Sequence, residues 1–342
     1  MKVAVGLSGG VDSAVSAALL KKQGHDVLGV FLWCYQTRDF PCTTDQDRAM
    51  AVRVADHLHI SIKIIDLRRD YRRSVVDYFF SEYKDGRTPN PDVMCNKEIK
   101  FGLFYQQMIE KEKFDFVVTG HYARIKKDLR FKTYDLRKGL DDSKDQSYFL
   151  YTLLESQLEH IMFPVGDLKK DQVRKLAKDF RLPNADRPDS QGICFIGEVD
   201  IKKFLSTKFE IRKGNVLDGN GNIIGQHDGV WFYTIGQRHG FEIRNSKFEI
   251  RKGEERKPLY ILSKNSERNE LVVGGKEECY SKEFEINNVH WINGKPEIKL
   301  LRNKLLTVRI RHLGEMYPCT IKPVENYSSN KARSSQPSVS NN

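Results

Sequence analysis

Apolar and helical segments alternate along the first 200 residues of the chain. Four short runs are mainly apolar, as strands of a buried parallel sheet are: residues 3–7, 26–33, 60–67 and 114–119. Four further segments carry apolar residues at helical spacing: residues 14–23, 45–58, 69–84 and 99–112. Because a helix between two strands returns the chain to the same edge of a sheet, this order predicts an α/β domain with a parallel sheet over residues 1–200.

The pattern changes near residue 200. Short β-like runs follow, with turn signals such as Asp218-Gly219-Asn220-Gly221 and Gly274-Gly275. They predict a small central β domain at 205–277 and a further β segment at 281–323, in which Thr307-Val308-Arg309-Ile310-Arg311 places alternate arginines on one exposed face. Residues 324–342 are rich in Ser and Asn and almost free of apolar side chains, so we expect a disordered tail there.

A glycine loop, Ser8-Gly9-Gly10-Val11-Asp12-Ser13, stands between the first strand and the first helix. Its backbone N–H groups can converge on an anion, and its two serines add hydroxyl donors. No lysine follows the glycines, which excludes a Walker loop, and the spacing of a dinucleotide fingerprint is absent. A carboxylate beside a phosphate is repelled unless a cation lies between them, so Asp12 predicts Mg²⁺ held by a polyphosphate. The alternative is an ordinary turn in which Asp12 caps the helix.

Composition narrows the class of protein. The chain has 342 residues with 57 Lys and Arg against 46 Asp and Glu, and the net charge of +11 favours a polyanionic partner, although it also fits a general lysine bias. No apolar stretch approaches the roughly 20 residues of a membrane span, and no leader precedes the first strand, so we expect a cytoplasmic protein that does not bind membranes. We also expect it to be a monomer. The six cysteines form no CxxC pair, which argues against a zinc ribbon or a secreted disulfide framework.

Two loops carry cysteines that are candidates for chemistry. Gly86-Arg87-Thr88-Pro89-Asn90-Pro91-Asp92-Val93-Met94-Cys95-Asn96-Lys97 contains two prolines that make it rigid, and Arg87, Lys97 and Lys100 would lower the pKa of the Cys95 thiol. A structural turn with a half-buried cysteine is the alternative. Asp189-Ser190-Gln191-Gly192-Ile193-Cys194-Phe195-Ile196-Gly197 places the second cysteine between glycines. Two cysteines in separate loops suggest that they act as a pair.

Other polar positions follow the ends of predicted strands and helices. The apolar Leu32 lies near the end of the second strand, where open α/β sheets bind ligands, and we expect it against an adenine. His121 follows Gly120 at the end of the fourth strand, where substrate contact and loop packing are both open. Residues 123–139 resemble a hairpin, and 169–180 form a basic amphipathic helix that is either solvated or a phosphate-tracking surface.

Together these motifs resemble those of the tRNA-specific 2-thiouridylases of the MnmA type, over nearly the whole chain. The glycine loop is similar to that of the ATP pyrophosphatases. The resemblance implies an ATP pyrophosphatase fold followed by two small β domains. It also implies ATP-dependent adenylation of C2 of the wobble uridine in the anticodon region of tRNA, followed by sulfur transfer from a persulfide supplied by a donor protein.

The resemblance also implies roles for individual residues. Cys95 corresponds to the nucleophile, Cys194 to the persulfide carrier that ends in a disulfide with it, and Asp92 to an acid or base. The implied nucleotide site with its Mg²⁺-bound ATP comprises Gly6, Leu7, Ser8, Gly9, Gly10, Val11, Asp12, Ser13, Leu32 and Gly120. The implied base and tRNA contacts are Asn90, Pro91, Asp92, His121, Lys144, Asp145, Gln146, Arg311 and His312, and no metal is bound by protein ligands alone.

The sequence departs from the family pattern at two places. Ala14 follows the loop where the family often has a second serine. The family's terminal β-barrel has further strands after the position of Lys322, so the resemblance predicts an incomplete barrel here.

Two other functions remain open at this point. An adenylating enzyme with a small acceptor would explain the loop, but neither the cysteines nor the basic residues. An RNA-binding module with structural ATP would leave both cysteines inert.

Overall fold

The computed structural model describes residues 1–36, 43–189, 200–244, 258–294, 296, 301 and 304–323. The described residues form two compact units. The first contains residues 1–76, 90–189 and 290–323, and the second contains residues 77–89 and 200–289. None of the helices in the described ranges is both long and apolar enough to span a membrane.

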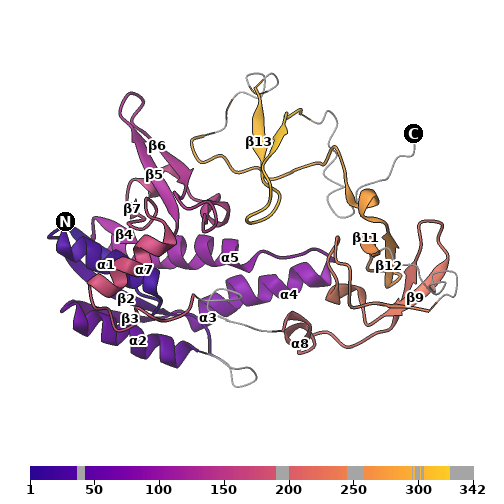
Figure 1. Ribbon diagram of the computed structural model, residues 1–342, viewed down its shortest axis with the longest axis horizontal. Helices are drawn as coiled ribbons and strands as arrows, with labels where there is room; N and C mark the ends of the chain where they lie inside the picture. Colours follow the sequence, from indigo (N-terminus) through magenta and orange to yellow (C-terminus); the bar gives the residue numbers. More distant parts are fainter. Residues whose placement is uncertain are drawn as a thin grey trace. The chain divides into compact units, whose positions relative to one another are not determined.

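The first unit is built on a parallel sheet of five strands in the order β3-β2-β1-β4-β7 (Figure 1). The strands are β1 (Lys2–Gly6), β2 (Asp26–Trp33), β3 (Ser61–Asp66), β4 (Phe116–Val118) and β7 (Ile161–Met162). The apolar runs of the sequence therefore become neighbouring parallel strands, and the predicted α/β fold is confirmed. The short fifth strand has too few residues to give a pattern of its own.

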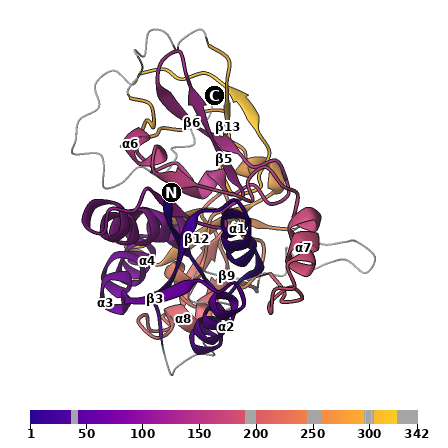
Figure 2. The same ribbon diagram turned by 90° about the vertical axis from the view of Figure 1, so that its left-hand side faces the viewer.

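Helices cover both faces of this sheet (Figure 2). Helices α1 (Val11–Lys22), α2 (Thr44–His57) and α7 (Lys170–Asp179) pack on one face, where Val15, Val54 and Val173 join Val3 and Val5 of β1 in one core. Side chains of a strand alternate between faces, and a Cβ on Gly6 would lie 3.6 Å from Phe104 of the π-helical segment η2 (Cys95–Phe104). That segment therefore covers the opposite face.

The predicted helix at 69–84 is divided among three elements. They are α3 (Arg68–Tyr71), the π-helical turn η1 (Arg72–Val76) and α4 (Asp77–Lys84), and the boundary between the units falls between Val76 and Asp77. The aromatic residues were expected in a core. Tyr71 is buried in the first unit, whereas Phe79 packs 5.6 Å from Phe204 in the second.

The rest of the first unit comes from a hairpin and from the C-terminal part of the chain. Strands β5 (Ala123–Asp128) and β6 (Thr133–Lys138) form the predicted hairpin. Strands β13 (Leu306–Val308) and β14 (Tyr317–Cys319) form a two-stranded antiparallel sheet, and the described part of 281–323 shows no closed barrel. The arginines were expected to share one exposed face, and Arg311 is exposed, but the Arg309 side chain is only 14% exposed because its Nη1 lies 2.7 Å from Oδ2 of the buried Asp145. The Tyr148 hydroxyl donates to the Ile310 carbonyl at 3.0 Å.

The second unit is a β structure with a small core. Five strands lie in the order β10-β9-β8-β12-β11, all antiparallel neighbours except β12 and β8. They are β8 (Gly214–Leu217), β9 (Ile223–His227), β10 (Glu242–Ile243), β11 (Tyr260–Asn265) and β12 (Glu270–Gly274). The core includes Val216, Tyr233, Ile261 and Leu271. The predicted domain limits of 1–200, 205–277 and 281–323 remain predictions, and the expected disordered tail lies outside the described residues.

One lysine is buried in the second unit. Lys264 is 3% exposed, and its Nζ donates to the Tyr233 carbonyl at 2.7 Å. Burial lowers the pKa of Lys264 to about 8. The unfolded chain therefore binds this proton more tightly than the folded unit does, and the stability of the unit should rise as the pH increases from about 8 to about 10.

We predict that this rise depends on Lys264. In a Trp33→Phe/Trp291→Phe background, Trp231 fluorescence reports urea unfolding of the second unit. Its midpoint should increase between pH 7.5 and pH 9.5 by an amount equivalent to about 1 kcal/mol or more. Lys264→Met should remove most of the increase, whereas the matched change at the exposed Lys276 should not. A Lys264→Met slope equal to that of the parent protein would show that another group titrates.

Candidate active site

The glycine loop has a fixed conformation between β1 and α1. Ser13 Oγ accepts the Ser8 N–H at 3.2 Å and donates to the Gly10 carbonyl at 3.1 Å. Gly9 has a φ of 80°, which favours glycine, and a Cβ there would lie 2.6 Å from the Asp47 carbonyl oxygen. No side chain caps the N-terminus of α1, so its first-turn N–H groups can serve an anion.

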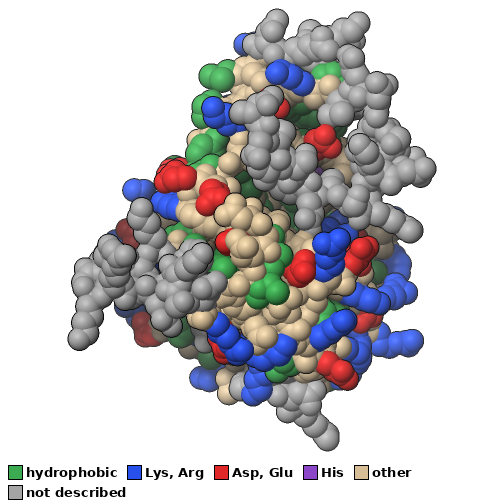
Figure 3. Space-filling view, turned by 90° about the vertical axis from the view of Figure 1, so that its right-hand side faces the viewer, with side chains coloured by type: hydrophobic (Ala, Val, Ile, Leu, Met, Phe, Trp, Pro, Cys, Tyr) green, Lys and Arg blue, Asp and Glu red, His purple; other side chains and the backbone are tan. Residues whose placement is uncertain are grey.

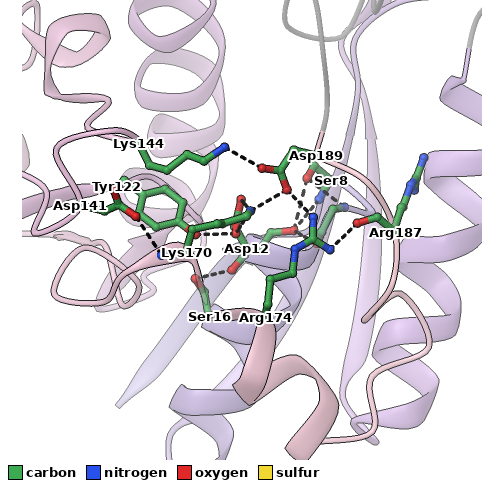
Figure 4. Close-up of polar contacts among 12 residues, drawn as sticks. Ser8, Asp12, Ser16, Tyr122, Asp141, Lys144, Lys170, Arg174, Arg187 and Asp189 are labelled. Carbon is green, nitrogen blue, oxygen red and sulfur yellow. Dashed lines mark hydrogen bonds and ion pairs between the residues drawn. The ribbon is translucent and has the colours of Figure 1, made fainter. Parts of the chain in front are cut away.

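Asp12 is held by two side chains from distant parts of the sequence (Figure 4). Its Oδ1 and Oδ2 lie 2.7 and 2.9 Å from Lys170 Nζ, and the Tyr122 hydroxyl donates to Oδ1 at 2.8 Å. Burial, together with the charge of Asp12, raises the pKa of Tyr122, which therefore remains a neutral donor. Asp12 consequently forms an ion pair across the site and does not cap α1.

Asp189 also pairs with Lys170 and binds two further cations. Lys170 Nζ lies 2.9 Å from Asp189 Oδ1, Lys144 Nζ lies 2.8 Å from Oδ2, and Arg174 also pairs with this carboxylate. Burial alone would raise the pKa of Asp189, but the hydrogen bonds and charges of Lys144 and Lys170 hold it well below its ordinary value. Lys170 and Arg174 are four residues apart on α7 and so share one face, which points into the site.

The segment after α7 forms direct hydrogen bonds to the backbone of the glycine loop. Asn184 Nδ2 donates to the Gly9 carbonyl at 2.9 Å, and Arg187 donates to the same oxygen at 3.2 Å while it pairs with Asp47. Gly120 approaches from the end of β4, where a Cβ would lie 2.6 Å from the Ser13 nitrogen. Close packing against the loop therefore requires glycine at position 120. Leu32 is buried in β2, and its contact with adenine remains a prediction.

The proline-rich loop forms a short capped helix ahead of Cys95. Asn90 Oδ1 accepts the Val93 N–H at 3.2 Å at the start of α5 (Pro91–Met94), where Pro91 fits the first turn. Cys95 follows as the first residue of η2 and is fully buried. Of its expected activators, Arg87 pairs with Glu82, Lys97 pairs with Glu98, and Lys100 lies 3.4 Å from His121. Their effect on the Cys95 thiol stays a prediction. Cys194 lies outside the described residues, so the pairing of the cysteines stays a prediction.

Several residues expected to contact tRNA also have partners inside the unit. His121 is buried beside Thr119, and burial together with the charge of Lys100 lowers its pKa well below the usual value, so its ring is neutral. Asp145 is fully buried and accepts the Gly139 and Ser147 N–H groups as well as Arg309. Gln146 Oε1 accepts the Tyr122 N–H at 2.9 Å.

The remaining two expected tRNA contacts lie on the C-terminal segment. The His312 ring lies 4.3 Å from that of Phe149, and Arg311 is exposed. The tRNA contacts of all these residues remain predictions.

Sequence reasoning did not single out six residues that shape the site: Tyr122, Lys170, Arg174, Asn184, Arg187 and Asp189. No motif marks them individually. The one available signal was the basic face of 169–180, of which Lys170 and Arg174 turn inward.

Comparisons with known proteins agree on one family. The family model described as the tRNA methyl transferase HUP domain matches residues 1–198, and that of the tRNA methyl transferase PRC-barrel domain matches 202–275. A tRNA-specific 2-thiouridylase MnmA of Colwellia psychrerythraea is 42% identical over 328 residues, covering 94% of this chain and 85% of the relative. The protein of the same name from Buchnera aphidicola is 44% identical over 299 residues, covering 85% and 79%.

Solved structures are more distant. The U34-tRNA thiolase NcsA from Methanococcus maripaludis has a TM-score of 0.37 and 21% identity, and the match covers 60% of this chain and 64% of that one. A similarity this low supports no statement about function.

We predict that Asp189 stabilises the site only while it is ionised. Asp189→Asn leaves Lys144, Lys170 and Arg174 without their shared partner and should lower the free energy of unfolding by about 1–2 kcal/mol at pH 7, since 27% of the side chain remains exposed. Because the folded-state pKa is depressed, the difference from wild type should persist above pH 5 and shrink as the pH falls below 4.

The matched control is Asp186→Asn, whose partner Lys178 is 3.5 Å away and whose side chain is 90% exposed. Chemical denaturation between pH 3 and pH 7 measures both variants. Equal effects of the two substitutions would contradict a special role for Asp189.

Proposed function

The chain belongs to the family of tRNA-specific 2-thiouridylases, and we propose that its loop at residues 8–13 activates the wobble uridine of tRNA with ATP, so that sulfur can replace the oxygen at C2. The chain is an ATP-dependent tRNA-uridine 2-sulfurtransferase. The observation that carries the residue-level proposal is the glycine loop with uncapped N–H groups and a carboxylate paired to Lys170.

Sulfur transfer explains the site better than the methyl transfer named in the family models. Methylation needs neither a phosphate-binding loop nor a pair of cysteines. Replacement of a carbonyl oxygen needs both, because the oxygen must first become a leaving group and a sulfur nucleophile must then attack the carbon.

The loop residues fit the phosphates of ATP, which supplies the adenylyl group when bound. Gly9 and Gly10 keep side chains away from the loop backbone, and Ser8 and Ser13 provide hydroxyl donors. We propose that Asp12 turns toward Mg²⁺ accompanying the phosphates. Lys170 would then exchange Asp12 for phosphate oxygens while Asp189 continues to hold its Nζ. A cation already in place would neutralise charge as pyrophosphate departs.

At the other end of the site, α5 would present the base to the sulfur chemistry. Asn90 and Pro91 fix the start of this short helix, which orders Asp92 and Cys95 within one turn. We propose that Asp92 acts as a general acid or base that transfers a proton to or from the uracil ring. The uridine must leave the anticodon stack to reach these groups, which a single-stranded loop permits at low cost.

The sulfur step requires a balanced exchange between two cysteines. A donor protein, such as a cysteine desulfurase or a relay protein, would leave a persulfide on Cys194. The terminal sulfur is delivered to C2 and AMP departs with the former carbonyl oxygen. Cys95 attacks the inner sulfur of Cys194, so one S–S bond breaks as the other forms, and an external reductant then resets the disulfide. We propose that the chain does this as a monomer.

The direct test is mass spectrometry of tRNA nucleosides after incubation with ATP, Mg²⁺ and a persulfide source. Formation of 2-thiouridine supports the proposal. Pyrophosphate release that does not depend on tRNA would favour adenylation of a small acceptor, and tRNA binding without pyrophosphate release would favour a binding module.

We predict that Asp12→Ala reduces tRNA-dependent pyrophosphate release at least a hundredfold, because the change removes metal–phosphate positioning. Binding of tRNA should change less than about threefold, since Asp12 faces Lys170 and Tyr122. Asp56→Ala, at an exposed position on α2, is the control. Normal pyrophosphate release by Asp12→Ala would exclude the assigned role.

We predict that Cys95 and Cys194 act in different steps of sulfur transfer. Cys194→Ser should release pyrophosphate with tRNA but transfer no sulfur, whereas Cys95→Ser should accept a persulfide on Cys194 without completing the product. Intact-mass measurement detects the persulfide, and nucleoside analysis detects the product. Normal 2-thiouridine formation by either variant would rule out the two-cysteine scheme.

A further inference from the structure

Net charge alone does not locate the surface that binds RNA. On the face shown in Figure 3, Lys and Arg side chains lie among Asp and Glu side chains. A more selective criterion is a group of cations without acidic partners next to exposed aromatic surface, because phosphates and unstacked bases require both. In the first unit, the β5–β6 hairpin meets this criterion.

The hairpin is strongly basic. Between residues 123 and 138 the acidic residues are Asp128 and Asp135, and the basic residues are Arg124, Lys126, Lys127, Arg130, Lys132, Arg137 and Lys138. Those near the base of the hairpin have acidic partners: Arg124 pairs with Asp167, Arg137 with Asp135 and Lys138 with Asp142. Within the described residues, Lys126, Lys127, Arg130 and Lys132 form no ion pair. Four cations near the tip therefore stand against the single carboxylate of Asp128, and the tip keeps a net positive charge.

The tip also exposes two large apolar side chains. Leu129 is 80% exposed and Phe131 is 75% exposed. Asp128 Oδ1 accepts the Arg130 N–H at 2.8 Å and the Phe131 N–H at 3.4 Å, so the turn is ordered by backbone donors. The side chains of Arg130 and Phe131 are not needed for that turn and remain available to a partner.

The position of the hairpin restricts what it can contact. Its first strand follows β4 at the edge of the sheet where Gly120 packs on the glycine loop. Six residues of extended strand span roughly 20 Å, so the tip projects that far from the nucleotide site. Figures 1 and 2 both show the hairpin projecting from the parallel sheet. A macromolecule held at the site would have to extend well beyond the reacting base to reach the tip.

We propose that the hairpin tip, residues 126–132, is a tRNA-binding element that contacts phosphates with Lys126, Arg130 and Lys132 and packs Phe131 against an RNA base or sugar. This inference rests on the function proposed above and extends it to an additional surface. The tip contacts the tRNA away from the wobble uridine, so it contributes to affinity and not to the chemical step.

The test compares two double charge reversals with the same spacing. Arg130→Glu/Lys132→Glu changes the tip. Lys111→Glu/Lys113→Glu changes two exposed lysines that precede β4 at the opposite edge of the sheet. The backbone is matched as well, because Lys132 and Lys113 have φ values of 54° and 58°. Both variants alter the net charge equally.

Filter binding at several salt concentrations measures the tRNA affinity. The tip variant should bind tRNA about tenfold more weakly at 0.1 M salt, and the slope of log affinity against log salt should fall by about 1–2. The control should stay within about twofold of wild type. Phe131→Ala, which keeps the turn, should weaken binding about fivefold with an unchanged slope. Pyrophosphate release at saturating tRNA should be normal in all variants, which also shows that they fold.

Wild-type affinity of both tip variants, or equal losses in tip and control reversals, would overturn the proposal. So would unchanged tRNA affinity with loss of sulfur transfer from a protein persulfide donor but not from inorganic sulfide, since the tip would then bind the donor. Formation of 2-thiouridine by the wild-type protein in the same assays tests the proposed function separately.

Discussion

The charge of Asp12 must be neutralised for the glycine loop to exist in this form. A carboxylate beside N–H groups that can serve an anion would repel such an anion, and Lys170 compensates the charge with contacts to both oxygens of Asp12. Lys170 is positioned in turn by Asp189, which Lys144 and Arg174 also hold. The geometry around the glycine loop thus depends on an alternating series of charges, and each member would be unfavourable if it were buried alone.

This series of charges explains why the residues around the glycine loop come from so many segments of the chain. The loop follows β1, Tyr122 follows β4, Lys170 begins α7, and Asn184 to Asp189 lie in the turn after α7. The carboxyl ends of neighbouring parallel strands meet at one edge of the sheet, so residues more than 150 positions apart become neighbours there. The tight approach of Gly120 to the loop fixes how closely two of these segments pack.

The fold of the first unit followed from sequence because β1, β2 and β4 have mostly buried side chains and therefore stand out in the sequence as apolar runs. The glycine loop could also be predicted, since its glycines and serines between a strand and a helix form a recognisable motif. The partners of Asp12 could not be predicted, because the Lys170 ion pair and the Tyr122 hydrogen bond depend on the tertiary structure and leave no local pattern in the sequence. The boundary within 69–84 was missed for a similar reason: apolar spacing continues through it, while Tyr71 and Phe79 pack in different cores.

The ion pair between Asp145 and Arg309 has a consequence for the order in which the protein is made. Burial alone would raise the pKa of Asp145, and Arg309 with the groups of Ser147 and Gly139 brings it below its ordinary value. The two partners are 164 residues apart, which corresponds to roughly ten to thirty seconds of synthesis at ordinary ribosome speeds. During that interval the nascent chain contains the carboxylate but not its guanidinium. The first unit therefore cannot complete its interior when only its N-terminal part has emerged from the ribosome, and its final packing step waits until the segment that carries Arg309 has left the exit tunnel.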